Sequence, residues 1–337
     1  MAVLSFEKDL DKLRGEIDKV KESGTSDGGS DGRLADLEDK LEQSTLQVFS
    51  ALSAWDRVQL ARHPDRPHTL DYIDHIFSDF IELHGDRRFG DDAAIVGGPA
   101  KFDGQRVMVV GHQKGRGTRD SVKRNFGMAS PEGFRKGLRL MRQAEKFGLP
   151  VITFVDIPGA SPVLEAEERG QAWAIADNLL GMIELRVPII VAVTGEGGSG
   201  GALALGIGDR VLIQEYGVYS VASPEGCASI VWRDHKFAPE AAEALKLTPT
   251  DLLKLGVVDR IVREPLGGAH RDYAKAAEIL AEDIAEELNA VTKISTDELI
   301  AGRYRKYRAM GRDVVDNLAT DESNAEPRPK VREGKSR

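Results

Sequence analysis

Two amphipathic patterns open the chain. Apolar residues recur every three or four positions over residues 5–22 and again over 34–52, which predicts two helices with one apolar face each. Between them, the segment 23–32 (SGTSDGGSDG) is predicted to be a flexible linker. The helices can pair as a hairpin on their own domain or contact a partner subunit.

From about residue 93 the pattern alternates between strands and helices. Short β-branched runs, each closed by glycine, proline or a polar residue, predict strands at AIVGG, RVMVVGHQ, PVITFVDIPG, PIIVAVTG, RVLIQEY and VYSVASP. Amphipathic stretches at 131–148 and 167–185 predict helices between them. The alternation predicts an α/β fold of parallel β-α units, with ligand-binding loops beyond the carboxyl ends of the strands.

After residue 238 the pattern is helical, most clearly over 273–291. The expected organisation is an N-terminal helix and linker (1–32), a main domain (33–293), a C-terminal helix (294–318) and a disordered tail (319–337) that lacks apolar periodicity.

Composition narrows the class of protein. The 337 residues are 41% hydrophobic and 30% charged, which is typical of a globular protein. No apolar run reaches the roughly 18 residues of a membrane helix, and the N-terminus is charged, so we expect a soluble, cytoplasmic protein. The single cysteine, Cys227, cannot form an internal disulfide or a cysteine-rich zinc site, so no metal is expected in this chain.

The charge is acidic as a whole and basic in one segment. A formal net charge of -9 argues against a protein that mainly coats nucleic acid. Residues 114–146 nevertheless contain ten basic and three acidic side chains. Basic residues interrupted by glycine can hold phosphates, and Lys114, Arg116 and Arg124 are our candidates for contacts to coenzyme A or to a carrier.

The glycine-rich segment 187–209 fits three unrelated patterns. G-x-G-x-x-G from Gly195 is the dinucleotide fingerprint, but the expected acidic residue about 20 positions later is missing from a clean context. G-x-S-x-G around Ser199 is a nucleophile elbow, which needs a later carboxylate and histidine, and only His235 and His270 follow.

The third interpretation needs no side chain. A strand that ends in small residues and turns into an apolar helix leaves backbone N–H groups free at the helix start, where they suit a developing oxyanion. Gly200 and Gly201 are the candidate donors, and Gly197 and Gly198 would shape the crevice. The alternative is that these glycines only permit tight packing of strand on helix.

A second strand-end loop follows the same logic. In VDIPGA, Gly159 and Ala160 turn after a strand, so they are candidates for the other wall of the crevice. Glu167 and Glu168 follow near a helix start, where their charge favours the helix dipole.

Longer motifs, in order, carry a family resemblance. They are RHPDRPHTLDYI, GDRRFGDDAAIVGG, GHQKGRGT, RNFGMASPEGFRKGLRLM, D-x-PGA followed by AEERGQ, GEGGSGGALALGIGD, YSVASPEGCASIVW and EPLGGAHR. Over about Leu34 to Arg308 the chain closely resembles the alpha subunits of the bacterial-type acetyl-CoA carboxylase carboxyltransferases.

The resemblance implies a crotonase-like fold, a spiral of β-β-α units, in an alpha2beta2 heterotetramer. It implies carboxyl transfer from carboxybiotin on a biotin carboxyl carrier protein to acetyl-CoA, giving malonyl-CoA for fatty-acid synthesis alongside a biotin carboxylase. Zinc would lie only in the beta subunit. The alpha-side oxyanion donors would be Gly200 and Gly201, with Gly159 and Ala160 beside biotin.

The chain departs from the family pattern in the second loop. Relatives commonly read D-T-P-G-A-Y-P-G with another glycine shortly after, where this chain has Ile157, Ser161, Val163 and Glu165. The resemblance therefore leaves the acyl-CoA preference open. Two other classes stay open as well: a self-sufficient crotonase-type hydrolase or isomerase using Glu167 or Glu168, and a regulatory protein that binds nucleic acid through the basic segment.

Overall fold

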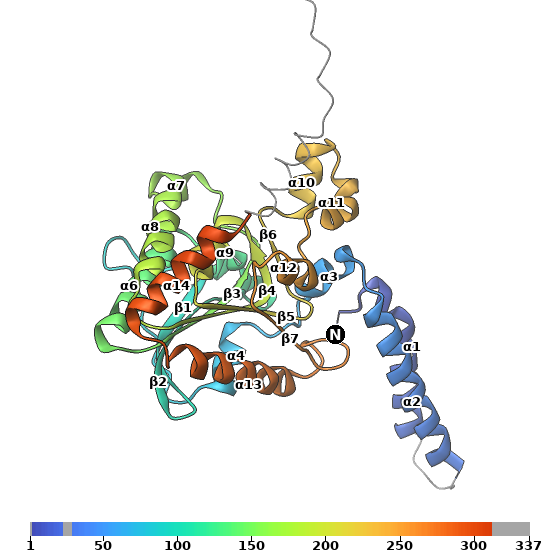
Figure 1. Ribbon diagram of the computed structural model, residues 1–337. Coiled ribbons are helices and arrows are strands. Elements are labelled where there is room, and N and C mark those ends of the chain that lie inside the picture. Colours follow the sequence, from blue (N-terminus) through green and yellow to red (C-terminus); the bar gives the residue numbers. More distant parts are fainter. Residues whose placement is uncertain (1, 23–28, 312–337) are drawn as a thin grey trace, which may run out of the picture.

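The computed structural model describes residues 2–22 and 29–311, and shows helices packed on both faces of a seven-stranded sheet (Figure 1). The strand order is β1-β2-β3-β4-β5-β7, and β6 pairs with β4 off this path. The strands are β1 (Ile95–Phe102), β2 (Gln105–His112), β3 (Val151–Ile157), β4 (Ile189–Gly198), β5 (Arg210–Gln214), β6 (Val218–Ser220) and β7 (Arg260–Val262).

The expected α/β fold is confirmed, with one correction to the strand directions. From β2 to β7 neighbouring strands are parallel, whereas β1 and β2 form an antiparallel hairpin. Asp103 and Gly104 close that hairpin in positive-φ conformations. A two-residue turn requires antiparallel strands, because a parallel connection needs a long crossover.

Alternate residues of each strand point into two separate cores. Met108, Val110 and Val191 pack under α6 (Pro131–Phe147), α8 (Gln171–Glu184) and α9 (Ser199–Gly206). On the other face, the intervening residues Val109 and Ile190 pack under α4 (Thr69–Ile76) and α13 (Tyr273–Val291). The period of two along each strand places one apolar set on each face.

The remaining helices connect or extend these layers. They are η1 (Ser5–Glu7), α1 (Lys8–Glu22), α2 (Gly29–Ser50), α3 (Ala54–Ala61), α5 (Gly117–Lys123), η2 (Asn125–Gly127), α7 (Leu164–Glu168), α10 (Pro224–Val231), η3 (His235–Phe237), α11 (Ala238–Ala244), α12 (Pro249–Lys254) and α14 (Thr296–Ala309). No helix in the described ranges is long and apolar enough to cross a membrane.

Two predicted boundaries are wrong. The helix expected over 167–185 is two helices, α7 and α8, separated at Gly170, whose φ of 82° is left-handed. The linker expected over 23–32 is too long at its end, because α2 already begins at Gly29. The rest of that linker, 23–28, lies outside the described residues.

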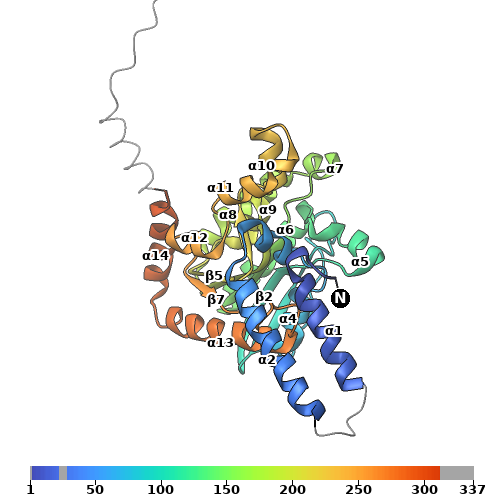
Figure 2. The ribbon, with the colours of Figure 1, turned by 90° about the vertical axis from the view of Figure 1, so that its right-hand side faces the viewer.

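The N-terminal helices form an antiparallel hairpin that projects from the main body (Figures 1 and 2). Lys21 on α1 pairs with Glu38 on α2 at 2.8 Å. At the base of the hairpin, Leu10 and Phe49 pack with Leu60 and Tyr216 of the main body. Of the two options left open by the sequence, the hairpin therefore packs on its own chain.

The base of the hairpin also buries a charged cluster. Glu7 lies 2.6 Å from the Arg271 guanidinium and 3.6 Å from Nε2 of His270. Burial alone would raise the pKa of Glu7, but His270 and Arg271 outweigh it and lower the pKa to about 2.

The last described helix is fixed to the sheet by one buried arginine. Arg303 on α14 pairs with Asp209 at 2.8 Å and donates to backbone carbonyls that include those of Met182 and Val187. The predicted C-terminal helix thus packs on the main domain as α14. The expected end of that helix at 312–318 and the expected tail at 319–337 lie outside the described residues.

Candidate functional site

Two strand-end loops meet at the carboxyl ends of β3 and β4. A methyl group placed on Gly201 would lie 2.7 Å from the backbone nitrogen of Ala160, and one on Gly198 would lie 2.1 Å from the carbonyl oxygen of Pro158. Both distances are below any normal contact. Glycine is therefore required at 198 and 201 for the two backbones to approach each other.

Gly159 and Gly200 differ from those two residues, because they border open space. A methyl group on Gly159 would meet no atom within 4 Å, and one on Gly200 would meet only Ile175, at 3.6 Å. Gly200 also lines an apolar cavity of about 410 Å³, together with Leu203 and Tyr219. We call the place where Gly159–Ala160 and Gly200–Gly201 meet the glycine crevice.

The crevice presents unpaired backbone donors. Gly200 and Gly201 are the second and third residues of α9, so their N–H groups precede the first intrahelical hydrogen bond. The N–H groups of Gly159 and Ala160 have no acceptor among residues 2–22 and 29–311. Donors from two loops, at the start of a helix, can stabilise a developing negative charge between them.

The turn into α9 carries a strained residue. Ser199 has φ of 52°, a left-handed conformation that is uncommon outside glycine, and it is exposed. The β4 strand runs on to Gly198, because Gly197 and Gly198 pair with Tyr219 and Ser220 of β6. The strand predicted at PIIVAVTG is therefore too short at its end, and the sharp turn lies at Ser199.

The second loop is held from below by backbone contacts. Ser161 N–H donates to the Ala129 carbonyl at 3.0 Å, and the Gln171 side chain donates to the same oxygen at 2.8 Å. Asp92 in turn accepts a hydrogen bond from Ser130 N–H at 2.7 Å. These bonds fix the position of Ala160 relative to the sheet.

A buried charge network lies under the crevice. Lys114 Nζ, at the end of β2, is 2.7 Å from Asp156 on β3 and 2.8 Å from Glu196 on β4. Glu196 also pairs with Arg62 at 2.6 Å. Burial would raise the pKa of Asp156, but the charge of Lys114 outweighs it and keeps the carboxyl ionised.

His112 lies beside these groups and is fully buried. Its ring nitrogens have no hydrogen-bond partner among the described residues. Burial lowers the pKa of His112 to about 4, although the charge of Asp156 and the backbone groups of Gly201 and Phe154 act to raise it. The imidazole is therefore neutral near pH 7, against the backbone that carries the crevice donors.

The three cations proposed for phosphate binding are already paired. Lys114 is held by Asp156 and Glu196, and Arg116 pairs with Asp71 at 2.7 Å. Arg124 pairs with Asp120 at 3.0 Å. Lys114 and Arg116 line a polar cavity of about 400 Å³, but their charges are largely neutralised by carboxylates.

The structure separates the members of the proposed nucleophile triad. The rings of His270 and His63 stack with their centroids 4.1 Å apart, in the charged cluster at the base of the N-terminal hairpin. His235 lies on η3 beside Asp234. Neither histidine hydrogen-bonds Ser199 in the part of the chain that the structure describes.

Two other groups of side chains contain residue types that can act as catalysts or metal ligands. Glu167 and Glu168 are exposed on α7. Ligand atoms of Glu7, His63 and His270 lie within 4.8 Å of one another, a spacing that could hold a metal ion. However, Nδ1 of His63 accepts a hydrogen bond from a backbone N–H, and Glu7 forms an ion pair with Arg271. The geometry is therefore that of an ion-pair cluster.

Sequence reasoning missed Asp156 and Glu196 as members of one network with Lys114 and Arg62. Both acids stand at strand ends beside the two glycine motifs, which is the only signal the sequence carries for them. It also missed His112, the second-last residue of the run RVMVVGHQ.

Comparison with known proteins places this chain in a family. The family model described as acetyl co-enzyme A carboxylase carboxyltransferase-like matches residues 3–311. The acetyl-coenzyme A carboxylase carboxyl transferase subunit alpha of Geobacter metallireducens is 56% identical over 309 residues, covering 92% of this chain and 97% of that protein. The subunit of the same name from Halorhodospira halophila is 55% identical, covering 91% and 97%.

Solved structures support the fold. A Pseudomonas malonate decarboxylase hetero-tetramer in complex with coenzyme A matches with a TM-score of 0.55 at 17% identity, over 70% of this chain and 93% of that one. Transcarboxylase 12S, with methylmalonyl-coenzyme A and methylmalonic acid bound, matches with a TM-score of 0.51 at 24% identity, over 64% and 42%.

The sheet, its helical layers and the paired glycine loops define a crotonase-like fold, and the family model places the chain in the carboxyltransferase class. Within that class, the chain belongs to the acetyl-CoA carboxylase carboxyltransferase family, and the relatives that it matches over nearly their whole length are alpha subunits.

Proposed function

We propose that the chain is the alpha half of a carboxyltransferase that moves a carboxyl group from carboxybiotin to acetyl-CoA, giving malonyl-CoA. The observation that carries the proposal is that two loops with unpaired N–H groups, Gly159–Ala160 and Gly200–Gly201, lie against each other at the carboxyl ends of β3 and β4. The reaction needs such donors, because each half of it develops negative charge on a carbonyl-type oxygen.

The steps assign roles to these residues. Loss of the carboxyl group from carboxybiotin leaves negative charge on the ureido oxygen, which the Gly200 and Gly201 N–H groups stabilise, with Ala160 beside them. The freed N1′ of biotin then takes a proton from the acetyl group of acetyl-CoA, and the resulting enolate attacks the released carbon dioxide. Backbone donors and the substrate's own base explain why no side-chain triad is needed.

The neighbouring side chains support this assignment by position. Lys114, Asp156 and Glu196 fix the ends of β2, β3 and β4, so the donors are held in place before substrate binds. The apolar cavity at Gly200 gives room for the non-polar part of the biotin bicycle.

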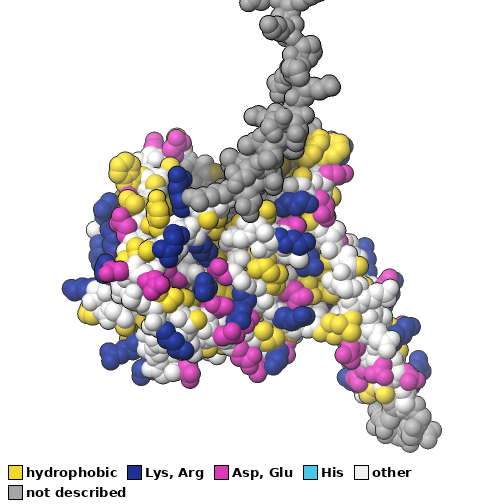
Figure 3. Space-filling view, viewed as in Figure 1, with side chains coloured by type: hydrophobic (Ala, Val, Ile, Leu, Met, Phe, Trp, Pro, Cys, Tyr) yellow, Lys and Arg dark blue, Asp and Glu magenta, His cyan; other side chains and the backbone are white. Residues whose placement is uncertain are grey.

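The second half of the active site would come from a zinc-bearing beta subunit in an alpha2beta2 assembly. Large apolar side chains are exposed on helices and a loop near the crevice, including Trp173 on α8 at 73%, Val221 after β6 at 76% and Ile230 on α10 at 79%. Figure 3 shows apolar side chains at the top of the molecule over α7 and α10. Apolar exposure on this scale is typical of a protein interface.

In this proposal the biotin carboxyl carrier protein delivers carboxybiotin to the crevice, and a biotin carboxylase reloads it. Of the other classes, a self-sufficient hydrolase would need an activated carboxylate, whereas Glu167 and Glu168 are exposed on α7.

The test is malonyl-CoA formation from carboxybiotin and acetyl-CoA, measured with this chain alone, with its cognate beta subunit alone, and with both. We expect activity only in the mixture. Turnover by this chain alone would favour the hydrolase or isomerase class, and a stable but inactive complex would contradict the proposed role of the crevice.

A further inference from the structure

A second cavity, away from the glycine crevice, is lined mainly by arginines. It has a volume of about 390 Å³ and lies between α6, α8 and the loop before β1. We call it the arginine cavity. Its charged lining residues are Arg87, Arg88, Arg135, Arg139, Arg142, Asp86 and Asp177.

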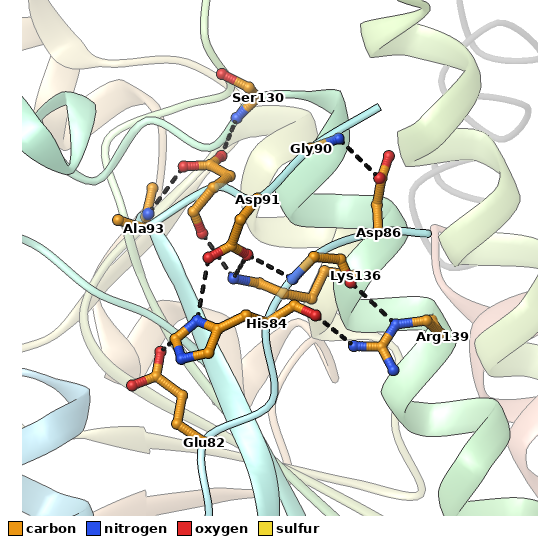
Figure 4. Close-up of polar contacts among 12 residues, drawn as sticks. Glu82, His84, Asp86, Gly90, Asp91, Ala93, Ser130, Lys136 and Arg139 are labelled. Carbon is orange, nitrogen blue, oxygen red and sulfur yellow. Dashed lines mark hydrogen bonds and ion pairs between the residues drawn. The ribbon is translucent and has the colours of Figure 1, made fainter. Parts of the chain in front are cut away.

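Most of these arginines lack a carboxylate partner. Arg135 is neutralised, at 2.8 Å from Asp86 and 3.2 Å from Glu132. Arg139 instead donates to the carbonyl oxygens of Gly85 and His84, and its guanidinium points to the loop backbone in Figure 4. Carbonyl oxygens orient a guanidinium without cancelling its charge.

The other three arginines are also unneutralised. Arg87 donates to the His84 carbonyl at 2.8 Å. Arg87, Arg88 and Arg142 have no carboxylate within 4.0 Å in the described part of the chain. Arg139 is half-buried, and burial together with the charge of Arg87 lowers its pKa. Four guanidinium groups thus share one concave site with excess positive charge.

The acidic residues of the adjoining loop cannot supply the missing charge, because they are already engaged. One oxygen of Asp86 accepts from the N–H groups of Arg88, Phe89 and Gly90 while the other binds Arg135. Asp91 pairs with the buried Lys136 at 2.5 Å and accepts from Gly85 N–H (Figure 4). The carboxylates of the loop are therefore used within the loop and by Arg135 and Lys136, and leave Arg87 and Arg88 without a carboxylate partner.

We propose that the arginine cavity binds a small molecule that carries clustered phosphates, the chemistry of a nucleoside diphosphate. Planar guanidinium groups match phosphate oxygens in paired hydrogen bonds, and several of them around one cavity fit a ligand with more than one phosphate. The same chemistry occurs in a free nucleotide and in the phosphorylated end of coenzyme A.

The test measures ADP binding to the full chain by calorimetry at low ionic strength. The variant is Arg139→Gln with Arg142→Gln, and the matched control is Arg33→Gln with Arg106→Gln, two exposed arginines outside the cavity. Because each lost charge-assisted contact weakens binding by about tenfold, we expect ADP to bind the cavity variant about 100-fold more weakly than the control. Adenosine, which has no phosphate, should bind neither protein.

Two further measurements identify the source and the competing occupant. A raised KM for acetyl-CoA in the assembled cavity variant would assign the phosphates to coenzyme A, and an unchanged KM with ADP binding lost would assign a separate nucleotide site. Equal ADP affinity in the cavity variant and the control would overturn the proposal. Failure of ADP to bind the wild-type chain would also overturn it. If the cavity variant then also failed to assemble with the beta subunit, the arginines would be assigned to an acidic protein partner.

Discussion

At the scale of single residues, the glycines around the crevice do two different things. Gly198 and Gly201 allow two backbones to come closer than a side chain permits, whereas Gly159 and Gly200 leave space in front of the N–H groups. The packing interpretation is therefore supported for Gly198 and Gly201, and the open space beside Gly200 leaves room for the oxyanion that we propose it binds.

The difference between these glycines can be tested directly. Gly201→Val should push the loop at Ala160 away and lower carboxyl transfer by about 10²-fold, the scale of losing one oxyanion donor. Gly302→Val on α14 is the matched control, since a side chain there meets only Arg305, at 3.9 Å. Turnover is measured on variants shown by chemical denaturation to be folded, and normal turnover in the Gly201 variant would remove this residue from the mechanism.

The glycine loops could be predicted from the sequence, but the charge network under the crevice could not. Glycine motifs are local and visible in a string of letters, but the pairing of Lys114 with Asp156 and Glu196 joins three strands. Arg116 shows the reverse problem, because its basic neighbourhood predicted a phosphate site while its true partner, Asp71, lies far away in sequence. Long-range charge pairing depends on topology, which a single sequence does not encode locally.

At the scale of elements, periodicity was a good guide where an element is uniform. The helix expected over 273–291 matches α13, because an unbroken apolar face packs along the sheet. Periodicity failed where a single residue or a pairing strand sets the boundary of an element. Gly170 divides a helical pattern in two, and pairing with β6 extends β4 through residues that look like loop.

The N-terminal hairpin gives a prediction with a defined pH dependence. The Glu7 pKa falls from 4.5 to about 2 in the folded chain, so its ionised form contributes roughly 3 kcal/mol at pH 7. Glu7→Gln should lower the free energy of unfolding by that order in urea titrations and expose α1 to proteases. Asp9→Asn, in an exposed pair with Lys12, should change little.

The sign of the pH dependence follows from the lowered pKa. The contribution of Glu7 is complete above pH 4.5 and is lost as the pH falls toward 2. The stability difference between wild type and Glu7→Gln should therefore shrink over that range. A difference that stayed constant down to the lower limit would show that the Glu7 charge is not what holds the hairpin.

At the scale of the whole molecule, several large apolar side chains are exposed near the crevice, among them Trp173 and Leu203. Trp173→Glu on α8 should weaken binding of the beta subunit by about 30-fold or more, because large aromatic residues dominate interface energies. Phe147→Glu, at the far end of α6 and 61% exposed, is the control. The measurement is complex formation by size-exclusion chromatography with light scattering, and unimpaired assembly of the Trp173 variant would place the interface elsewhere.

The extended segment before β1 has a consequence for how the molecule can associate. Residues 78–83 hydrogen-bond along β1, through Ser78 to Lys101 and Leu83 to Gly97, and β7 at the opposite side is only three residues long. Gly98 allows this covering segment to approach, since a methyl group there would lie 1.9 Å from the Ile81 carbonyl oxygen. Neither border of the sheet therefore offers a long row of free backbone groups to another chain. Subunits must join through helices and side chains, and unwanted fibre-like growth by strand addition is blocked.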